Sequence, residues 1–463
     1  MSAAEELAGL LGAHRVSSDP NDLDHHSHDW SPAALQKKRA GEALRRPTCV
    51  VRPVNTEQVA TILRWAHETR TSIVPFGGGS SVVRGIEPAD CVVVDLQAME
   101  NILHFDTKSR LVTAQAGVWG PDLVRSLGAW GFTLGHEPQS IRLSTVGGWL
   151  ATRSAGQLSA RYGAIEDMVA GLEAVVPGGR IVRSKPMPRR SVGPDIAGLM
   201  IGSEGTLGII TEATLRVHPI SHVRADRCVT FDHMADGVTA ARTIAQSDLG
   251  PTLVRLYDKE DSMLFGMSID GFEPRPLLLL SFEGFDADTR ADRALGACGG
   301  RAGDPKLVEH WWEHRNDAVE TFRGAMDGVG PLGPHGVADT IELSATWSDL
   351  RDLYHAVKDA LSERAQLCGC HLSHVYVDGA CLYFTLASTC DDEHSAARTL
   401  EGWWETAMEV CLAHGGSISH HHGIGRTKAR WLPTELGEWW HVLVAVKQAV
   451  DPLGIMNPGA MGL

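Results

Sequence analysis

Short apolar runs alternate with polar and glycine-rich segments in the first quarter of the chain. Residues 48–54, 73–76 and 92–96 are rich in β-branched residues and are typical of buried strands. Between the first two runs, Thr56 caps a helix whose apolar residues recur at helical spacing from 59 to 66. The pattern predicts a small βαβ-type unit that carries a glycine-rich loop after its second strand.

Residues 110–218 contain short strands separated by glycine-rich turns, with a single helix at 122–130. This alternation is typical of an α+β fold rather than of a regular βαβ series. Pro219 marks a boundary, and strands alternate with amphipathic helices from there to about residue 410. Leu277 to Leu280 is a candidate buried strand in this second part.

The chain therefore divides into four parts. Residues before 46 are polar and irregular, which predicts a solvated arm, and the last fifty residues carry a helix at 439–450. We predict an α+β protein made of an N-terminal arm (1–45), a first domain (46–219), a second α+β domain (220–410) and a C-terminal segment (411–463).

The composition indicates a globular protein and narrows its partners. Hydrophobic residues make up 43% of the 463 positions and charged residues 21%, so the chain can bury large cores. With 42 lysines and arginines against 57 acids, the formal charge is −15, which disfavours nucleic acid and anionic membranes as partners. An anionic substrate would therefore need arginines placed locally.

Targeting and redox features are sparse. No stretch approaches the ~20 apolar residues of a transmembrane span, and the acidic N-terminus does not match a secretory signal. Nine cysteines are scattered without CxxC pairs, which argues against a disulfide framework or a zinc ribbon. We expect reduced and mostly buried thiols, a cytoplasmic location and a homodimer.

Three adjacent histidines, His420, His421 and His422, lie in a glycine-bounded segment from 415 to 426. Imidazoles change charge near neutral pH and also bind metals, so the run indicates either an acid–base site or a metal site. In an extended chain the first and third rings would share one face. Another histidine-rich stretch, 24–30, could also bind a metal, but no cysteine lies nearby in sequence and we expect it to be solvated.

The segment from Pro75 to Ser81 places three successive glycines directly after a predicted strand. Glycines can adopt the backbone conformations that let several N–H groups converge on one anion, such as a pyrophosphate. The segment lacks the Lys-Ser/Thr pair of a nucleotide P-loop and the GxGxxG spacing of a Rossmann fold. Taken alone, it fits an anion-binding loop and a tight turn equally well.

Companion segments at 135–149, 152–156 and 202–212 also combine glycines with small polar residues. Together with 75–81, and in this order, they look like the PCMH-type FAD-binding domain of the vanillyl-alcohol-oxidase superfamily, over about residues 45–220. The resemblance implies a two-subdomain FAD-binding domain and an α+β cap domain with an antiparallel sheet that faces the isoalloxazine ring. It also implies that a C-terminal helical segment completes the flavin site.

The resemblance implies FAD contacts from several stretches of the chain. The residues expected to contact FAD are Pro75, Phe76, Gly77, Gly78, Gly79, Ser80, Ser81, Gln139, Ser140, Ser144, Thr145, Gly148, Thr152, Ser154, Ala155, Glu204, Gly205, Thr206, Gly208 and Ile210. Relatives with covalent flavin often attach it to a histidine or cysteine near the glycine-rich loop, where this chain has two serines. We therefore expect non-covalent FAD.

Within the superfamily, the chain is most similar to the alkyldihydroxyacetonephosphate synthases, the flavoenzymes of ether-lipid synthesis. The likeness rests on the segments 135–138, 144–149, 193–195, 202–208, 376–384 and 419–423. It implies exchange of acyl for alkyl on acyl-dihydroxyacetone phosphate through a flavin N5 adduct, without net redox change. The implied substrate is small, is anionic or phosphorylated, and can carry a lipid tail.

The resemblance assigns the chemistry to Tyr383, to the histidines from His420 to His422, and to Arg255. The tyrosine would hold a substrate oxygen or assist proton transfer, a histidine would take a proton, and the arginine would grip a phosphate or carboxylate. Without the family, Tyr383 fits a half-buried strand residue, and Arg255 fits an ion pair with Asp258 or Glu260.

Related 2-hydroxyacid dehydrogenases bind a divalent metal through two histidines of one motif and a glutamate of another. In this chain Tyr383 replaces the second histidine, and His421 replaces the glutamate. These changes weaken a hard-metal site, so we expect no metal, although His371, His374 and His421 leave a zinc site open.

Two enzyme classes therefore stay open. One is the synthase-like transferase, and the other is an FAD-linked oxidoreductase, a dehydrogenase or oxidase of a 2-hydroxy acid or related alcohol, in which Arg255 holds a carboxylate. A second arginine for a substrate phosphate has its best candidate in Arg323, which is out of register. A flavin-free metal-binding protein would require the glycine-rich segments to be a coincidence, and we discount it.

Overall fold

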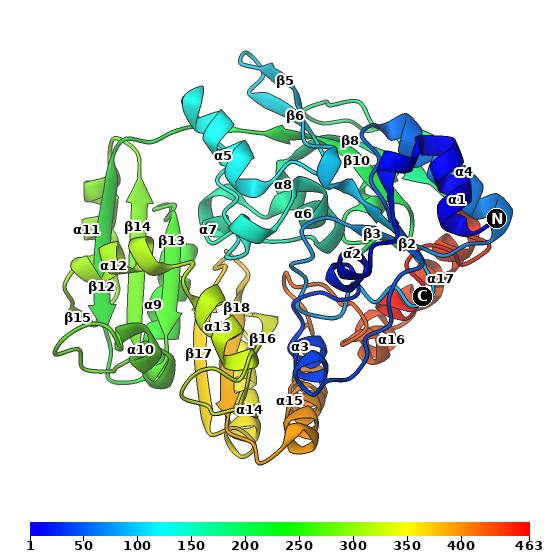
Figure 1. Cartoon of the computed structure of the whole chain (residues 1–463). Coiled ribbons are helices and arrows are strands. Elements are labelled where there is room, and N and C mark those ends of the chain that lie inside the picture. The colour runs from blue at the N-terminus through cyan, green and yellow to red at the C-terminus, as the bar shows by residue number, and fades with distance from the viewer.

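The computed structural model covers the whole chain, residues 1–463, except for the side chains of Ala318, Glu320 and Thr321. Two sheets and their helices form the first half, and a seven-stranded antiparallel sheet with its helices forms the second (Figure 1). The C-terminal segment returns to the first half (Figure 1).

The first sheet is the predicted βαβ-type unit, with the strand order β1-β2-β4-β3 and three parallel strands. Its strands are β1 (Val16–Ser17), β2 (Cys49–Val51), β3 (Ile73–Phe76) and β4 (Val92–Asp95). The apolar face of α4 (Thr56–Thr69) packs into the same core as these strands. Asn55, one residue before the predicted cap, accepts the Gln58 N–H and begins the helix.

The second sheet is antiparallel, in the order β5-β6-β10-β8-β9, and confirms the α+β pattern predicted for this region. Its strands are β5 (Ile102–Asp106), β6 (Leu111–Gln115), β8 (Val169–Val176), β9 (Arg180–Arg183) and β10 (Ile209–Arg216). The helices beside it are α5 (Gly120–Ala129), α6 (Val146–Thr152), α7 (Ser159–Tyr162) and α8 (Ile165–Met168). A two-stranded pair, β7 (Phe132–Thr133) and β11 (His218–Pro219), accompanies it.

The cap sheet has the order β15-β12-β14-β13-β17-β18-β16, and its buried β14 confirms the strand predicted at Leu277. Its strands are β12 (Arg224–Thr230), β13 (Leu253–Tyr257), β14 (Leu277–Glu283), β15 (Arg301–Ala302), β16 (Val337–Thr346), β17 (Leu367–Ser373) and β18 (Gly379–Ser388). Its helices are α9 (Met234–Ala245), α10 (Lys259–Gly266), α11 (Ala287–Ala297), α12 (Lys306–His314), α13 (Ala318–Met326), α14 (Leu350–Ser362) and α15 (Glu393–Ala413).

The register of three cap strands brings distant polar residues together. Tyr383 on β18 pairs with His371 on β17 on one side and with Glu342 on β16 on the other. Directly paired residues of an antiparallel sheet share a face, so these three side chains lie in one row.

The prediction of an irregular, solvated N-terminal arm is wrong. The segment forms α1 (Ala3–Leu11), α2 (Pro20–His25) and α3 (Pro32–Arg39). Side-chain caps begin all three helices, and α3 lies beside α15 (Figure 1). His26 and Asp29, from the histidine-rich stretch, are buried. The few apolar residues here pack on other elements, and a local hydrophobic pattern does not reveal such contacts.

The C-terminal segment contains α16 (Leu432–Leu436) and α17 (Trp439–Val450), which confirms the predicted last helix. Beyond α17, Met456 forms a parallel bridge with Ile73 and thereby joins the chain end to the first sheet. All nine cysteines are free, and only Cys390 is less than fully buried, as expected for structural thiols. Among the described helices, none has the length and apolar character that crossing a membrane requires.

Candidate functional site

A cavity of about 1140 Å³ lies between the first half and the cap sheet, with walls from both. Small-molecule pockets usually measure about 300–1,000 Å³, so this cavity has room for a ligand at the large end of the range. His371, Tyr383, His421 and His422 line it.

The glycine-rich segment approaches its neighbour so closely that side chains do not fit. A Cβ atom on Gly78 would meet the Leu143 carbonyl oxygen at 2.0 Å, and one on Gly77 would meet the Thr145 hydroxyl at 2.5 Å. Both contacts are far below normal packing distances. The chain therefore builds a backbone-lined cradle at the cavity wall, which fits a flat, phosphate-bearing cofactor such as FAD.

Nearly all predicted cofactor residues line this cavity. Of the twenty, only Gly79 and Thr206 lie outside the lining made by the described residues. Gly79 has a φ of +69° and provides the turn, and the buried Thr206 donates its hydroxyl to the Ser203 carbonyl. Both residues therefore support the cavity wall without lining the cavity.

Glu204 lines the cavity and also holds the segment that follows the histidines. Its carboxylate accepts the N–H groups of Ile424 and Gly425 at 2.6 and 2.7 Å. Burial raises the pKa of this carboxyl, although the two donors oppose the effect. Glu204 therefore ties the wall of the cofactor side to the segment that follows the histidines.

Tyr383 lies on the cavity wall with its hydroxyl donating to Thr340 at 3.0 Å. Its ring stacks on His371, with centroids 4.7 Å apart, and meets His422 edge-on at 5.5 Å. Burial raises the pKa of its hydroxyl, so the group stays protonated at neutral pH. Its single proton can be donated to a substrate oxygen once the hydroxyl turns away from Thr340.

Arg255 is held by the cap sheet rather than by an ion pair. It donates to the Tyr257 hydroxyl at 2.7 Å and to Nε2 of His371 at 2.9 Å. Nδ1 of His371 bonds Asp261 at 2.7 Å, which fixes the tautomer whose Nε2 lone pair accepts the Arg255 N–H. Burial and the Arg255 charge lower the pKa of His371 to about 4. Asp258, the partner considered from the sequence, pairs with Lys358 instead.

The three histidines separate into two groups. His421 and His422 line the cavity, whereas His420 stacks on His374 and Tyr376, with ring centroids 4.8 and 5.7 Å away. The expectation that the first and third rings share a face is wrong, because the backbone turns here rather than running extended. Burial lowers the pKa of His421 well below its usual value and that of His422 to about 4, so both are neutral at pH 7.

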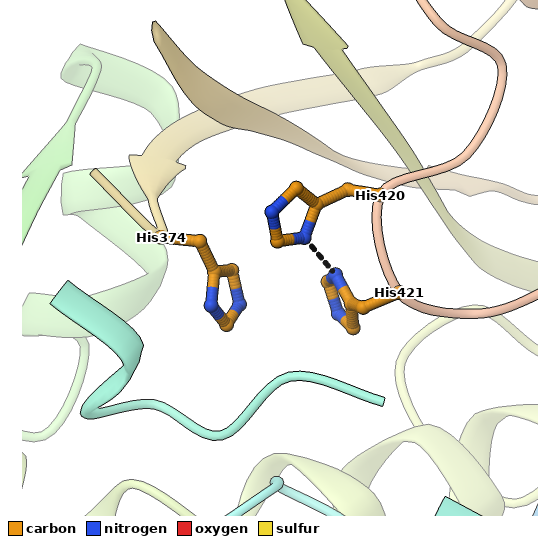
Figure 2. A group of neighbouring side chains, drawn as sticks. All are labelled: His374, His420 and His421. Atoms are coloured by element: carbon orange, nitrogen blue, oxygen red, sulfur yellow. Dashed lines mark hydrogen bonds between the residues drawn. The ribbon is translucent and has the colours of Figure 1, made fainter. Parts of the chain in front are cut away.

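One group of histidines could hold a metal ion. His374, His420 and His421 offer ring nitrogens within 4.8 Å of one another (Figure 2). Nδ1 of His374 already bonds the Ser159 hydroxyl at 2.8 Å, which leaves Nε2 for other contacts. The set considered from the sequence included His371, whose two nitrogens are both engaged.

Arg323 was the best candidate from the sequence for a second arginine that binds a substrate phosphate. Arg323 is paired with Asp327 at 3.6 Å and stacks over Trp30. Arg315 of the segment after α12 lines the cavity, bonds Glu137 at 2.8 Å and lies over Trp312. The second positive charge on the wall is therefore Arg315.

Several functional neighbours escaped the sequence reasoning, notably Glu342, Thr340, Asp261 and Lys428. Glu342 and Lys428 are fully buried and form an ion pair at 2.8 Å. A single charged residue within an apolar strand indicates that its charge is paired with a buried partner. Glu342, between Ile341 and Leu343, is such a residue.

Known protein families match both halves of the chain. Residues 47–185 match an FAD binding domain, and residues 222–461 match the C-terminal domain of FAD linked oxidases.

Individual relatives span almost the whole chain. An alkyldihydroxyacetonephosphate synthase of Trypanosoma brucei brucei is 30% identical over 498 residues, covering 99% of this chain and 80% of the relative. The uncharacterized FAD-linked oxidoreductase YgcU of Escherichia coli O157:H7 is 33% identical over 484 residues, covering 99% and 97%. A solved alkyldihydroxyacetonephosphate synthase structure superposes with a TM-score of 0.79 and 28% identity, over 98% of this chain and 84% of that one.

Proposed function

The chain belongs to the family of FAD-linked oxidases, and on that premise we propose that it exchanges acyl for alkyl on acyl-dihydroxyacetone phosphate. One observation carries the proposal. Tyr383, His421, His422 and Arg255 lie on the wall of the same cavity that the glycine-rich segment lines. Relatedness to the alkyldihydroxyacetonephosphate synthases over nearly the whole chain supports this choice of reaction.

The cradle formed by Gly77 and Gly78 fits the pyrophosphate of FAD, because backbone N–H groups can approach it without side-chain interference. Bound FAD would supply an electrophilic ring system that can accept a hydride or a carbon nucleophile. Ser80 and Ser81 cannot provide the histidine or cysteine that covalent attachment uses, so we propose non-covalent binding.

His422 is the proposed base. Its ring lines the cavity, and its buried Nδ1 faces Glu342 at 3.9 Å, which leaves Nε2 as the nitrogen for a substrate. Its lowered pKa keeps the ring neutral at pH 7, so the nitrogen lone pair can take the proton beside the substrate ketone. The Tyr383 hydroxyl would hold the ketone oxygen and stabilise the negative charge that develops there.

Arg255 would bind the substrate phosphate. The bonds to Tyr257 and His371 fix its guanidinium while leaving it on the cavity wall. A guanidinium can form two parallel bonds to a phosphate or carboxylate, which orients the substrate as well as attracting it. Because the net charge of −15 repels anions, an anionic substrate depends on this local positive charge for binding.

A second candidate is an FAD-linked oxidoreductase of a 2-hydroxy acid or related alcohol. The 33% identity to YgcU, which extends over 97% of that protein, favours it. In this reaction His422 would take the hydroxyl proton, and Arg255 would hold the carboxylate. The same side chains would thus serve either reaction.

One experiment separates the two functions. The purified protein should be yellow, and its flavin should be released by acid precipitation if it is bound non-covalently. Under anaerobic conditions we expect conversion of acyl-dihydroxyacetone phosphate and a long-chain alcohol to the alkyl product, without bleaching by D-2-hydroxy acids. Bleaching by a hydroxy acid, with no alkyl product, would favour the oxidoreductase, and a colourless protein would rule out both.

A further inference from the structure

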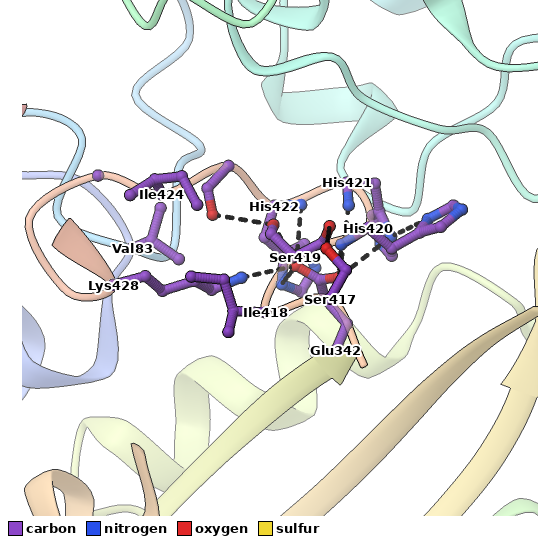
Figure 3. Close-up of polar contacts among 12 residues, drawn as sticks. Val83, Glu342, Ser417, Ile418, Ser419, His420, His421, His422, Ile424 and Lys428 are labelled. Carbon is purple, nitrogen blue, oxygen red and sulfur yellow. Dashed lines mark hydrogen bonds and ion pairs between the residues drawn. The ribbon is translucent and has the colours of Figure 1, made fainter. Parts of the chain in front are cut away.

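Glu342 is a fully buried carboxylate behind the histidine run. One of its oxygens accepts the Ser419 hydroxyl at 2.9 Å and the His422 N–H at 3.2 Å (Figure 3). Its other oxygen accepts the His421 N–H at 3.4 Å and also the His420 N–H. Three successive backbone donors therefore converge on one side chain.

Lys428 completes the surroundings of this carboxylate. Its Nζ donates to Glu342 at 2.8 Å, both side chains are fully buried, and the ammonium lies 5.6 Å from the centre of the Trp404 ring. A buried charge is strongly destabilising unless it is paired, so each partner requires the other. The pair joins β16 to the segment that follows the histidines.

The convergence decides where the imidazoles point. Along an extended chain, neighbouring side chains would point to opposite faces. In the structure the backbone bends around Glu342, and His421 and His422 both reach the cavity while His420 turns toward His374. Removal of the carboxylate would leave three backbone N–H groups without the acceptor that bends the chain.

Glu204 holds the next part of the same segment. It comes from the cofactor side of the fold and accepts the N–H groups of Ile424 and Gly425. The histidine run is thus held by a carboxylate from each half of the protein. Of these two carboxylates, Glu342 is the one that contacts the histidines themselves.

We propose that Glu342, paired with Lys428, is a positioning residue that holds His421 and His422 toward the cavity for proton transfer. The role of the two imidazoles rests on the proposed function, whereas the geometry that sets them does not. Small displacements matter, because misplacing a reacting group by about 1 Å can cost about 100-fold in rate.

The test compares the full-length, flavin-loaded protein with a double variant, Glu342→Leu/Lys428→Met. Apolar residues of similar volume often replace a buried ion pair without loss of stability, so the variant should fold, with a melting temperature lowered by the three N–H groups that lose their acceptor. We expect flavin content and KM to be retained and kcat to fall about 100-fold. Trp404→Phe, which changes the packing beside Lys428 and leaves the pair intact, is the matched control and should keep its kcat.

A measurement independent of turnover distinguishes failure of this inference from failure of the proposed function. The amides of residues 420–422 should exchange hydrogen slowly in the wild type and much faster in the double variant. Unchanged exchange, or a stable double variant with wild-type kcat, would overturn the positioning role. If the wild type shows no turnover in either reaction, the proposed function fails, and the exchange rates alone then decide about Glu342.

Discussion

Asp339 offers a quantitative test of the electrostatics beside the cavity. This carboxyl is 2% exposed on β16 and accepts the Trp404 indole N–H at 2.8 Å and the Thr340 N–H at 2.7 Å. Burial raises its pKa from 3.8 to about 7, although these donors and the Lys428 charge oppose the effect. The folded protein therefore keeps a proton that the unfolded chain releases near pH 4.

The sign of the effect follows from proton uptake. Between pH 4 and 7 the folded state binds more protons at Asp339 than the unfolded state, so stability falls as the pH rises through this window. The difference between 3.8 and about 7 corresponds to an upper limit of about 4 kcal/mol, all of it lost above pH 7.

Asp339→Asn removes this titration. Asparagine has a single oxygen, so it gives up one of the two bonds to Trp404 and Thr340, at a cost of about 1 kcal/mol at every pH. The variant should thus be about 0.5 kcal/mol less stable than the wild type near pH 4 and about 3 kcal/mol more stable near pH 8. Domains of this size shift Tm by about 2–4 °C per kcal/mol, so the Tm difference should change sign.

Thermal melts of both proteins from pH 4 to 8 measure this reversal. The exposed Asp391→Asn is the control, and its Tm difference should stay constant with pH. A Tm difference for Asp339→Asn that is equal at pH 4 and pH 8 would show that the buried carboxyl titrates normally. The reasoning from burial would then be wrong.

Three further substitutions test the site directly. Gly78→Ala should abolish flavin binding, because its Cβ would meet a carbonyl oxygen at 2.0 Å, and the absorbance of the purified protein measures this loss. The control Gly128→Ala, whose Cβ would enter open space, should retain the flavin. Arg255→Lys should raise KM for the anionic substrate about 10- to 100-fold with little change in kcat, since it loses paired bonding; equal KM values would remove the arginine from substrate binding. His422→Ala, which removes the proposed base, should keep the flavin and lose at least about 100-fold in kcat, and a fully active variant would exclude this histidine from proton transfer.

Local patterns predicted the elements that depend on local chemistry. The valine-rich strands β2 and β4 and the helices α5 and α17 follow from apolar spacing, and the glycine cradle follows from three successive glycines. The N-terminal helices escaped prediction because their stability comes from packing on distant elements such as α15. Short polar helices carry little periodicity of their own.

The sequence predicted which residues form the candidate site but not where their side chains point. Tyr383, Arg255 and the histidines follow from motif resemblance, and four of those five reach the cavity. His420 does not, because its direction is set by Glu342, which lies 78 positions away in the chain. A contact over that distance leaves no spacing that a single sequence could reveal.

The arrangement of charge explains how neutral histidines and a bound anion can occupy one cavity. A carboxylate facing the imidazoles from the cavity would raise their pKa and repel an anionic substrate. Here Glu342 lies behind the run, bonds its backbone and is neutralised by Lys428, while Arg255 supplies positive charge on the cavity wall. Burial keeps His421 and His422 neutral at pH 7, so their lone pairs stay available for proton abstraction beside an anion.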